Sequence, residues 1–115
     1  MTDEQITRHI AEKVMGWRYV DYKNGGTVYN RQETDAFICH ISDFTPLTDL
    51  NQAFEALEKW HGNSRDHETV ITLNYKIYTV EAYSGSKHDI CHIMEDESLA
   101  RAICLALVEA TKESE

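Results

Sequence analysis

The stretch that decides the fold is Leu99–Ala110, which reads Leu-Ala-Arg-Ala-Ile-Cys-Leu-Ala-Leu-Val-Glu-Ala and follows Ser98. Its apolar residues recur at the spacing of an α-helix, and Ser98 is a typical N-cap residue. The apolar face is wider than that of an ordinary surface helix. Such a helix is expected either in the centre of the domain or at a subunit interface. The residues that form this face are Leu99, Ala102, Ile103, Cys104, Leu105, Ala106, Leu107, Val108 and Ala110.

An amphipathic helix is also predicted at the start of the chain. Thr2 and Gln5 have the spacing of a capping box, and Gly16 stands where a left-handed residue is favoured after a helix. The sequence Val-Met-Gly-Trp at residues 14–17 then brings Trp17 next to the helix end. We expect Trp17 to fold back onto the apolar stripe of this helix, which consists of Ile6, Ile10 and Val14.

A third helix is predicted in the middle of the chain. Thr48 is a good N-cap residue, Asp49 adds an acid to the first turn, and Gly62 is expected just after the last turn. The spacing of the apolar residues places one face of this helix in the core. That face consists of Leu50, Ala53, Phe54, Leu57 and Trp60.

Strands are predicted between the helix in the middle of the chain and the last helix. Residues 68–73 and 76–83 are rich in β-branched and aromatic side chains. Residues 84–87 have turn composition, and residues 89–94 are expected to return as an antiparallel strand.

The segment 18–46 is harder to interpret. Residues 18–22 and 27–29 read as two strands of a hairpin around Asn24-Gly25-Gly26. Residues 36–41 read either as a strand or as a buried loop. The whole pattern predicts one α+β domain over residues 1–115, in which an antiparallel sheet of three to five strands packs with three helices as a layered sandwich.

Composition describes one small globular domain. Hydrophobic residues make up 42% of the 115 residues, and no apolar run approaches the ~18 residues that cross a membrane. The polar, acidic start of the chain is unlike a signal peptide. Three widely spaced cysteines, an odd number, favour reduced thiols over a disulfide framework. We therefore expect a soluble protein of the cytoplasm.

The net charge of −9 argues against direct binding to nucleic acid, because phosphates repel such a surface. It fits a basic partner, although it also fits a simple role in solubility. Residues 95–115 carry −4 of this charge. Some of these acids are explained as first-turn acids of the last helix. The candidate residues for a protein interaction are Glu95, Asp96, Glu97, Glu109 and Glu113.

One segment mixes aromatic and basic residues in a way that suits a small ligand. Aromatic rings and cations close together could hold a base and a phosphate. The alternative is a hairpin with ordinary tyrosines. The candidate ligand-binding residues are Arg18, Tyr19, Tyr22, Lys23, Tyr29 and Arg31.

The tetrapeptide Ile-Cys-His-Ile occurs twice, at residues 38–41 and 90–93. On a strand, each cysteine and the histidine beside it point to opposite faces, so neither tetrapeptide forms a metal site or a nucleophile–base pair by itself. His88 and His92 could share a face, but there is no C-x-x-C pair, no H-E-x-x-H helix and no P-loop. We expect buried, uncharged thiols, no metal, no cofactor and no catalytic residue.

Three blocks of this sequence resemble the phage ABA sandwich family of bacteriophage and prophage proteins. They are Ala-Glu-Lys-Val-Met-Gly-Trp at 11–17, Thr-Asp-Leu-Asn-Gln-Ala-Phe-Glu-Ala-Leu-Glu-Lys-Trp at 48–60, and Ala-Ile-Cys-Leu-Ala-Leu-Val-Glu-Ala at 102–110. The resemblance covers about a third of the chain and leaves residues 18–46 unmatched. It implies helices packed on a small antiparallel sheet, no catalytic residues, and expression in the cytoplasm of an infected bacterium.

Three functional hypotheses follow. The first is a non-enzymatic accessory protein that binds and interferes with a host factor, such as a nucleic-acid-recognising defence protein; it needs a contiguous acidic or apolar surface. The second is an oligomeric binder that sequesters a nucleotide-like host signal; it needs a pocket where cations and aromatic rings converge. The third is a metal-dependent Cys/His enzyme. Because the predicted apolar surface exceeds what a small core can bury, we also expect a homodimer or higher homo-oligomer, with no membrane partner.

Overall fold

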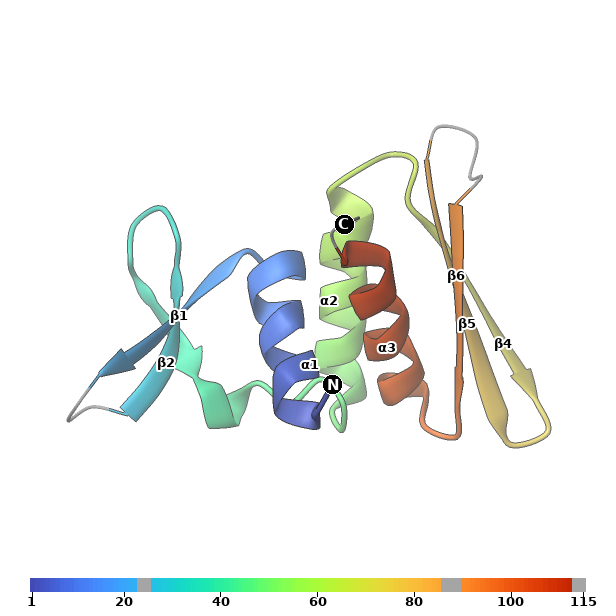
Figure 1. Ribbon diagram of the computed structural model, residues 1–115, viewed down its shortest axis with the longest axis horizontal. Coiled ribbons are helices and arrows are strands. Elements are labelled where there is room, and N and C mark those ends of the chain that lie inside the picture. The colour runs from blue at the N-terminus through green and yellow to red at the C-terminus, as the bar shows by residue number, and fades with distance from the viewer. Residues whose placement is uncertain (23–25, 86–89, 113–115) are drawn as a thin grey trace.

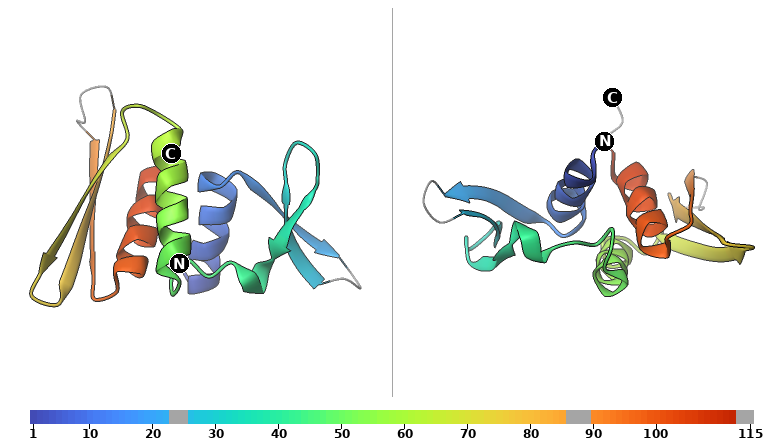
Figure 2. Two further views of the ribbon diagram at one scale, coloured as in Figure 1. Left: turned by 180° about the vertical axis from the view of Figure 1, so that it is seen from behind. Right: turned by 90° about the horizontal axis from the view of Figure 1, so that it is seen from below.

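The computed structural model describes residues 1–22, 26–85 and 90–112. Three helices form a middle layer, and a three-stranded antiparallel sheet lies on each side of them (Figure 1). Seen end-on, the helices form a triangle between the two sheets (Figure 2). The molecule measures 46 × 32 × 26 Å, and its longest axis runs from one sheet through the helices to the other. The predicted α+β class and the three helices are confirmed.

The first helix begins as predicted. Helix α1 (Asp3–His9) has Thr2 as its N-cap, and Thr2 and Gln5 form the capping box. The helix continues as a π-helical segment, η1 (Ile10–Val14), and Gly16 adopts a φ of +74°. The stripe of Ile6, Ile10 and Val14 is buried in the core.

The second helix, α2 (Leu50–Gly62), differs from the prediction at its ends and on its face. Its N-cap is Asp49, whose carboxylate accepts a hydrogen bond from the backbone N–H of Gln52 at 3.2 Å. Thr48 instead belongs to the preceding turn, and Gly62 is the last helical residue. Leu50 and Phe54 are exposed, because α2 packs on α3 through a narrower arc, whose buried residues are Ala53, Ala56, Leu57 and Trp60.

The third helix, α3 (Leu99–Thr111), is the most buried of the three, as predicted. Ser98 caps it, and seven of its residues are buried, against four in α2. It packs on both other helices and on one sheet. His9 of α1 joins its last turn through a 2.8 Å hydrogen bond to the Thr111 hydroxyl. No helix in the described ranges is long and apolar enough to cross a membrane.

Sheet A consists of β1 (Trp17–Tyr22), β2 (Gly26–Arg31) and β3 (Phe37–His40), in that order, and a short 3-10 helix, η2 (Ile41–Asp43), follows it. The segment 36–41 is therefore a strand followed by a helical turn. A bulge between Tyr29 and Asn30 shifts the register of β2 on β3. Trp17, Tyr29 and Phe44 pack together at ring-centroid distances of 5.0–6.0 Å, with Phe44 edge-on to the other two rings, and attach the sheet to the helices.

Sheet B consists of β4 (Glu68–Asn74), β5 (Ile77–Ser84) and β6 (Ile90–Asp96), with β5 in the centre. Residues 86–89 of the predicted turn and strand lie outside the described residues. Val80 and Ala82 of β5 are buried on the side of α3. The strands thus form two sheets and not one, because α2 follows β3 in the chain and crosses the middle layer before β4 begins.

Candidate functional site

Strand alternation distributes the predicted ligand-binding residues over three places. Arg18 and Tyr22 lie on the face of sheet A that points away from the helices, whereas Tyr19 and Tyr29 pair with each other on the inner face. Arg31 ends β2 and lines a separate cavity. Lys23 lies outside the described residues. The six candidates therefore do not form one site in a single chain.

The outer side of sheet A is centred on a buried amide. Asn30 is 2% exposed, and its Nδ2 donates to the Tyr22 hydroxyl and to an Asp35 carboxylate oxygen, both at 3.3 Å. The same carboxylate forms an ion pair with Arg18. The Oδ1 of Asn30 has no hydrogen-bond partner in the described part of the chain. The surrounding side chains enclose this oxygen, so it is not accessible from outside the molecule.

Aromatic rings lie beside this amide. Phe37 stands opposite Asn30 and is 60% exposed, and its ring lies 5.3 Å from that of His40. Aromatic residues and arginine are enriched in the cores of protein interfaces. We call this surface the outer face of sheet A; it comprises Arg18, Tyr22, Asn30, Asp35, Phe37 and His40.

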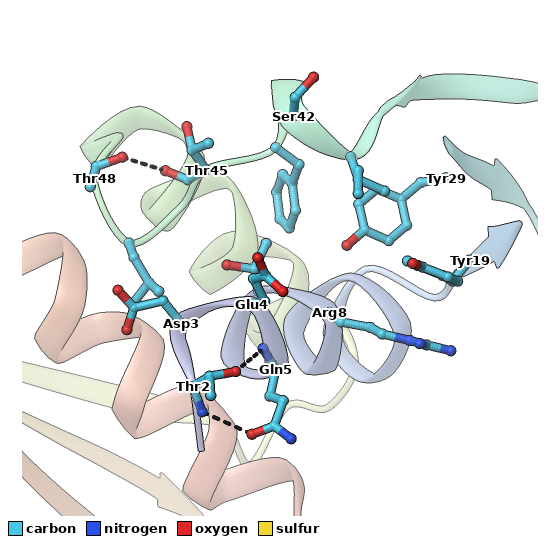
Figure 3. A pocket seen from close by; sticks show the side chains of 14 residues that line it. Thr2, Asp3, Glu4, Gln5, Arg8, Tyr19, Tyr29, Ser42, Thr45 and Thr48 are labelled. Atoms are coloured by element: carbon cyan, nitrogen blue, oxygen red, sulfur yellow. Dashed lines mark hydrogen bonds between the residues drawn. The ribbon is translucent and has the colours of Figure 1, made fainter. Parts of the chain in front are cut away.

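The inner side of sheet A borders a groove of about 700 Å³ between α1 and residues 41–48 (Figure 3). The guanidinium of Arg8 lies 3.8 Å from the centre of the Tyr19 ring. Burial raises the pKa of Tyr29 to about 12, so its hydroxyl keeps its proton near neutral pH. Asp3 and Glu4 also line the groove. Since these two carboxylates oppose one guanidinium, the groove does not favour an anion.

A second cavity, of about 690 Å³, collects positive charge. Lys13 from η1, Arg31 from the end of β2 and Lys59 from α2 line it together with Trp17. Glu33 is the one carboxylate among its described lining residues. Lys13 and Lys59 could not be identified from the sequence, because they come from two helices that are far apart in the chain and meet only through tertiary packing.

The predicted acidic residues do not gather into one patch among the described residues. Asp96 and Glu109 flank opposite ends of α3, and each has an intrachain partner: Arg101 at 3.6 Å and Lys112 at 2.6 Å. Glu95 and Glu97 are exposed near the start of α3. Glu113 lies outside the described residues.

The cysteines differ from one another in their surroundings. Cys104 is buried in the core, and burial raises its thiol pKa to about 12. Cys39 is half-buried, and burial raises its pKa as well. Cys91 is exposed, so the expectation of a buried thiol is wrong there. Its strand is covered by α3 on one side alone, and Cys91 faces the other side together with its cross-strand neighbour Tyr83.

We expect the purified protein to contain no stoichiometric metal, and a chelator to leave its melting temperature unchanged. Within residues 1–22, 26–85 and 90–112, no three His, Cys, Asp or Glu side chains are placed to hold an ion; His88 lies outside these ranges. Elemental analysis and thermal melts with and without chelator measure this. One zinc per chain would contradict the expectation.

Sequence comparison assigns the class of protein. The sequence model of the Phage ABA sandwich domain matches residues 8–108, so this chain belongs to that family. The match includes residues 18–46, which no motif had covered. The family is associated with phages and is not a known enzyme family. No curated protein and no solved structure matches the chain.

Proposed function

We propose that this chain is a non-enzymatic phage protein that binds a host protein through the outer face of sheet A and interferes with it. The supporting observation is the pair of exposed aromatic rings on this face: Tyr22 is 48% exposed and Phe37 is 60% exposed. Aromatic residues are enriched among the side chains that carry most of the binding energy of an interface. Tyr22 and Phe37 would supply apolar contact to a bound protein on either side of Asn30.

The charge of the chain suggests the chemistry of the partner. A net charge of −9 steers a basic surface toward this protein and repels nucleic acid. A defence protein that recognises nucleic acid has such a basic surface. The proposed place of action is accordingly the cytoplasm of the infected bacterium.

The proposal is tested by capture from a lysate of the infected host. Tagged wild type and the variants Phe37→Ala and Ile93→Ala are compared; Ile93 is similarly exposed but lies on sheet B. We expect one host protein to bind wild type and Ile93→Ala, and its affinity for Phe37→Ala to fall roughly 30-fold, as for a ~2 kcal/mol hot spot. Equal capture by all three proteins would refute the assignment of this face.

The positively charged cavity favours a second candidate function, the sequestration of a nucleotide-like anion. Three cations line this cavity together with Trp17, and an aromatic face with cations can hold a base and a phosphate. Mass spectrometry of the small-molecule fraction from the same capture tests it. A specific ligand should be lost from Lys59→Glu and retained by Arg65→Glu, which changes an exposed charge outside the cavity lining.

A further inference from the structure

Strand β4 carries apolar side chains that the fold leaves uncovered. Helix α3 packs on β5 and β6, and β4 lies beyond it at the edge of sheet B (Figure 1). Ile71 and its cross-strand partner Val80 share the side that faces α3, yet Val80 is fully buried and Ile71 is 38% exposed. Leu73 is on the same side and is 57% exposed. The apolar side of the sheet therefore extends past the helix that covers it.

The edge of β4 lacks the usual protection against pairing. In the described part of the chain β4 pairs with β5 alone, so every second residue directs its N–H and C=O groups to an open edge. Natural edge strands are commonly blocked by proline, by lysine or by an inward-pointing charge. The seven residues Glu-Thr-Val-Ile-Thr-Leu-Asn hold none of these between their first and last positions. Val70 adds exposed apolar surface on the opposite side of the strand.

We propose that a second copy of this chain pairs with this edge, β4 antiparallel to β4, around a two-fold axis at Thr72. The two sheets then form one continuous sheet, with three strands from each copy. In this register Ile71 stands opposite Leu73 of the second copy. Glu68, the first residue of β4, comes near the turn that follows β4 in the second copy, and Lys76 is part of that turn, so each end of the paired strands has an acid and a base close together.

Charge complementarity favours a second copy even though each chain carries −9. Residues 68–76 contain one acid and one base, so the paired segment is itself neutral. The antiparallel arrangement brings the acid of one copy to the base of the other twice, by symmetry. Repulsion between charges that lie more than ~8 Å apart is largely screened at physiological salt, whereas Glu68 and Lys76 of the second copy lie close together.

The same register gives a role to the turn between β4 and β5. Tyr75 is 95% exposed and has a φ of +66°, a conformation that non-glycine residues adopt at a cost. In the dimer this turn lies beside Thr69 of the second copy, whose hydroxyl bonds His61 at 2.7 Å. Tyrosine is a frequent energetic centre of interfaces. Contact across the two-fold axis would cover its ring.

The symmetry also places the helices. Antiparallel pairing of two edge strands puts the two-fold axis perpendicular to the sheet, so both α3 helices lie on the same side. Ile71 and Leu73 of both copies then lie between the two helices and cover one another. This surface belongs to sheet B, at the far end of the molecule from sheet A, so the inference stands apart from the proposed function and its test.

Light scattering after size exclusion, over a wide concentration range, tests the inference. Wild type should have twice the 13.3 kDa mass of the chain. Leu73→Lys should raise the dissociation constant at least roughly 100-fold, because two buried leucines are lost per dimer. The matched control is Ile93→Lys, on the outward side of the same sheet with the same 57% exposure; it should remain dimeric. A monomeric wild type, or a Leu73→Lys protein that stays dimeric, would overturn the inference.

A charge exchange tests the register. Glu68→Lys should weaken the dimer roughly tenfold, because two attractive pairs become repulsive. Adding Lys76→Glu should restore wild-type association, since each pair again joins opposite charges. If the double variant is no tighter than Glu68→Lys, the alignment around Thr72 is wrong. Thermal melts of the variants confirm that each one folds.

Discussion

Replacement of Trp60 by alanine should destabilise the protein by ~3–5 kcal/mol, the range expected for loss of a large buried aromatic side chain. Trp60 is almost fully buried in α2. Its ring stacks on that of His67 at 4.0 Å with an angle of 8° between the planes. The Nδ1 of His67 lies 2.6 Å from the carbonyl oxygen of Trp60. Loss of the indole thus opens a cavity in the core and releases the segment that leads into β4.

Urea unfolding followed by circular dichroism measures this effect. Trp60→Phe should lose less stability than Trp60→Ala, because a phenyl ring still fills part of the cavity and can still stack on His67. His67→Ala should lose less than Trp60→Ala, since it removes the stacking and leaves the core filled. If Trp60→Ala and His67→Ala were equally stable, Trp60 would not be the core residue described here.

Leu107→Ala should cost ~2–5 kcal/mol, mainly through a cavity in the middle layer. Leu107 is fully buried on α3, the helix that contacts α1, α2 and strands β5 and β6 of sheet B. A cavity at this position weakens several contacts together, because neighbouring elements cannot all move inward to close it.

The matched control for Leu107 is Leu50→Ala, the same substitution at an exposed position of α2. We expect Leu50→Ala to change the free energy of unfolding by less than ~1 kcal/mol. Equilibrium unfolding of both variants in parallel separates two effects on stability: the loss of a buried side chain and the difference in helix propensity between leucine and alanine. Equal stability of the two would show that α3 is not the centre of the core.

Local signals predicted the helices because their causes lie within a few residues. The capping box at Thr2, the N-cap at Ser98 and the positive φ of Gly16 each depend on short-range chemistry. The N-cap of α2 was misplaced by one residue, since Thr48 and Asp49 are both suitable and the turn at Thr45 decides between them. The exposure of Leu50 and Phe54 depends on how closely α3 approaches, which no local pattern contains.

The division of the strands into two sheets could not be predicted from the sequence. Strand composition indicates that a segment is extended. Which strands pair with one another depends on where the helices place each hairpin. The repeated tetrapeptide shows this most clearly. Cys39 faces inward opposite Tyr29, whereas Cys91 faces outward opposite Tyr83, although both occupy the same place in Ile-Cys-His-Ile. The two identical tetrapeptides have opposite orientations because the helices cover each sheet from one side. The packing of the helices, and not the tetrapeptide, decides which side of the strand that is.

The candidate site was predictable in part. Alternation along β1 already separates Arg18 and Tyr22 from Tyr19, so their failure to converge follows from the strand assignment. The meeting of Arg31 with Lys13 and Lys59 does not follow from any pattern, since it joins three elements. The unpaired Oδ1 of Asn30 lies beside the bulge at Ile38 of β3, and the sequence predicts neither of these features.

Each sheet is built from one consecutive run of the chain, residues 17–40 for sheet A and 68–96 for sheet B. Consecutive strands of each sheet are close together in the sequence, so each sheet can assemble with little dependence on the other, and the helices act as a spacer. Energetic effects at distant, unconnected sites add to within ~0.3–0.5 kcal/mol. A change at Phe37 and a change at Leu73 should therefore behave as independent perturbations. Selection can then diversify what one end of the molecule recognises while the opposite end keeps its own contacts.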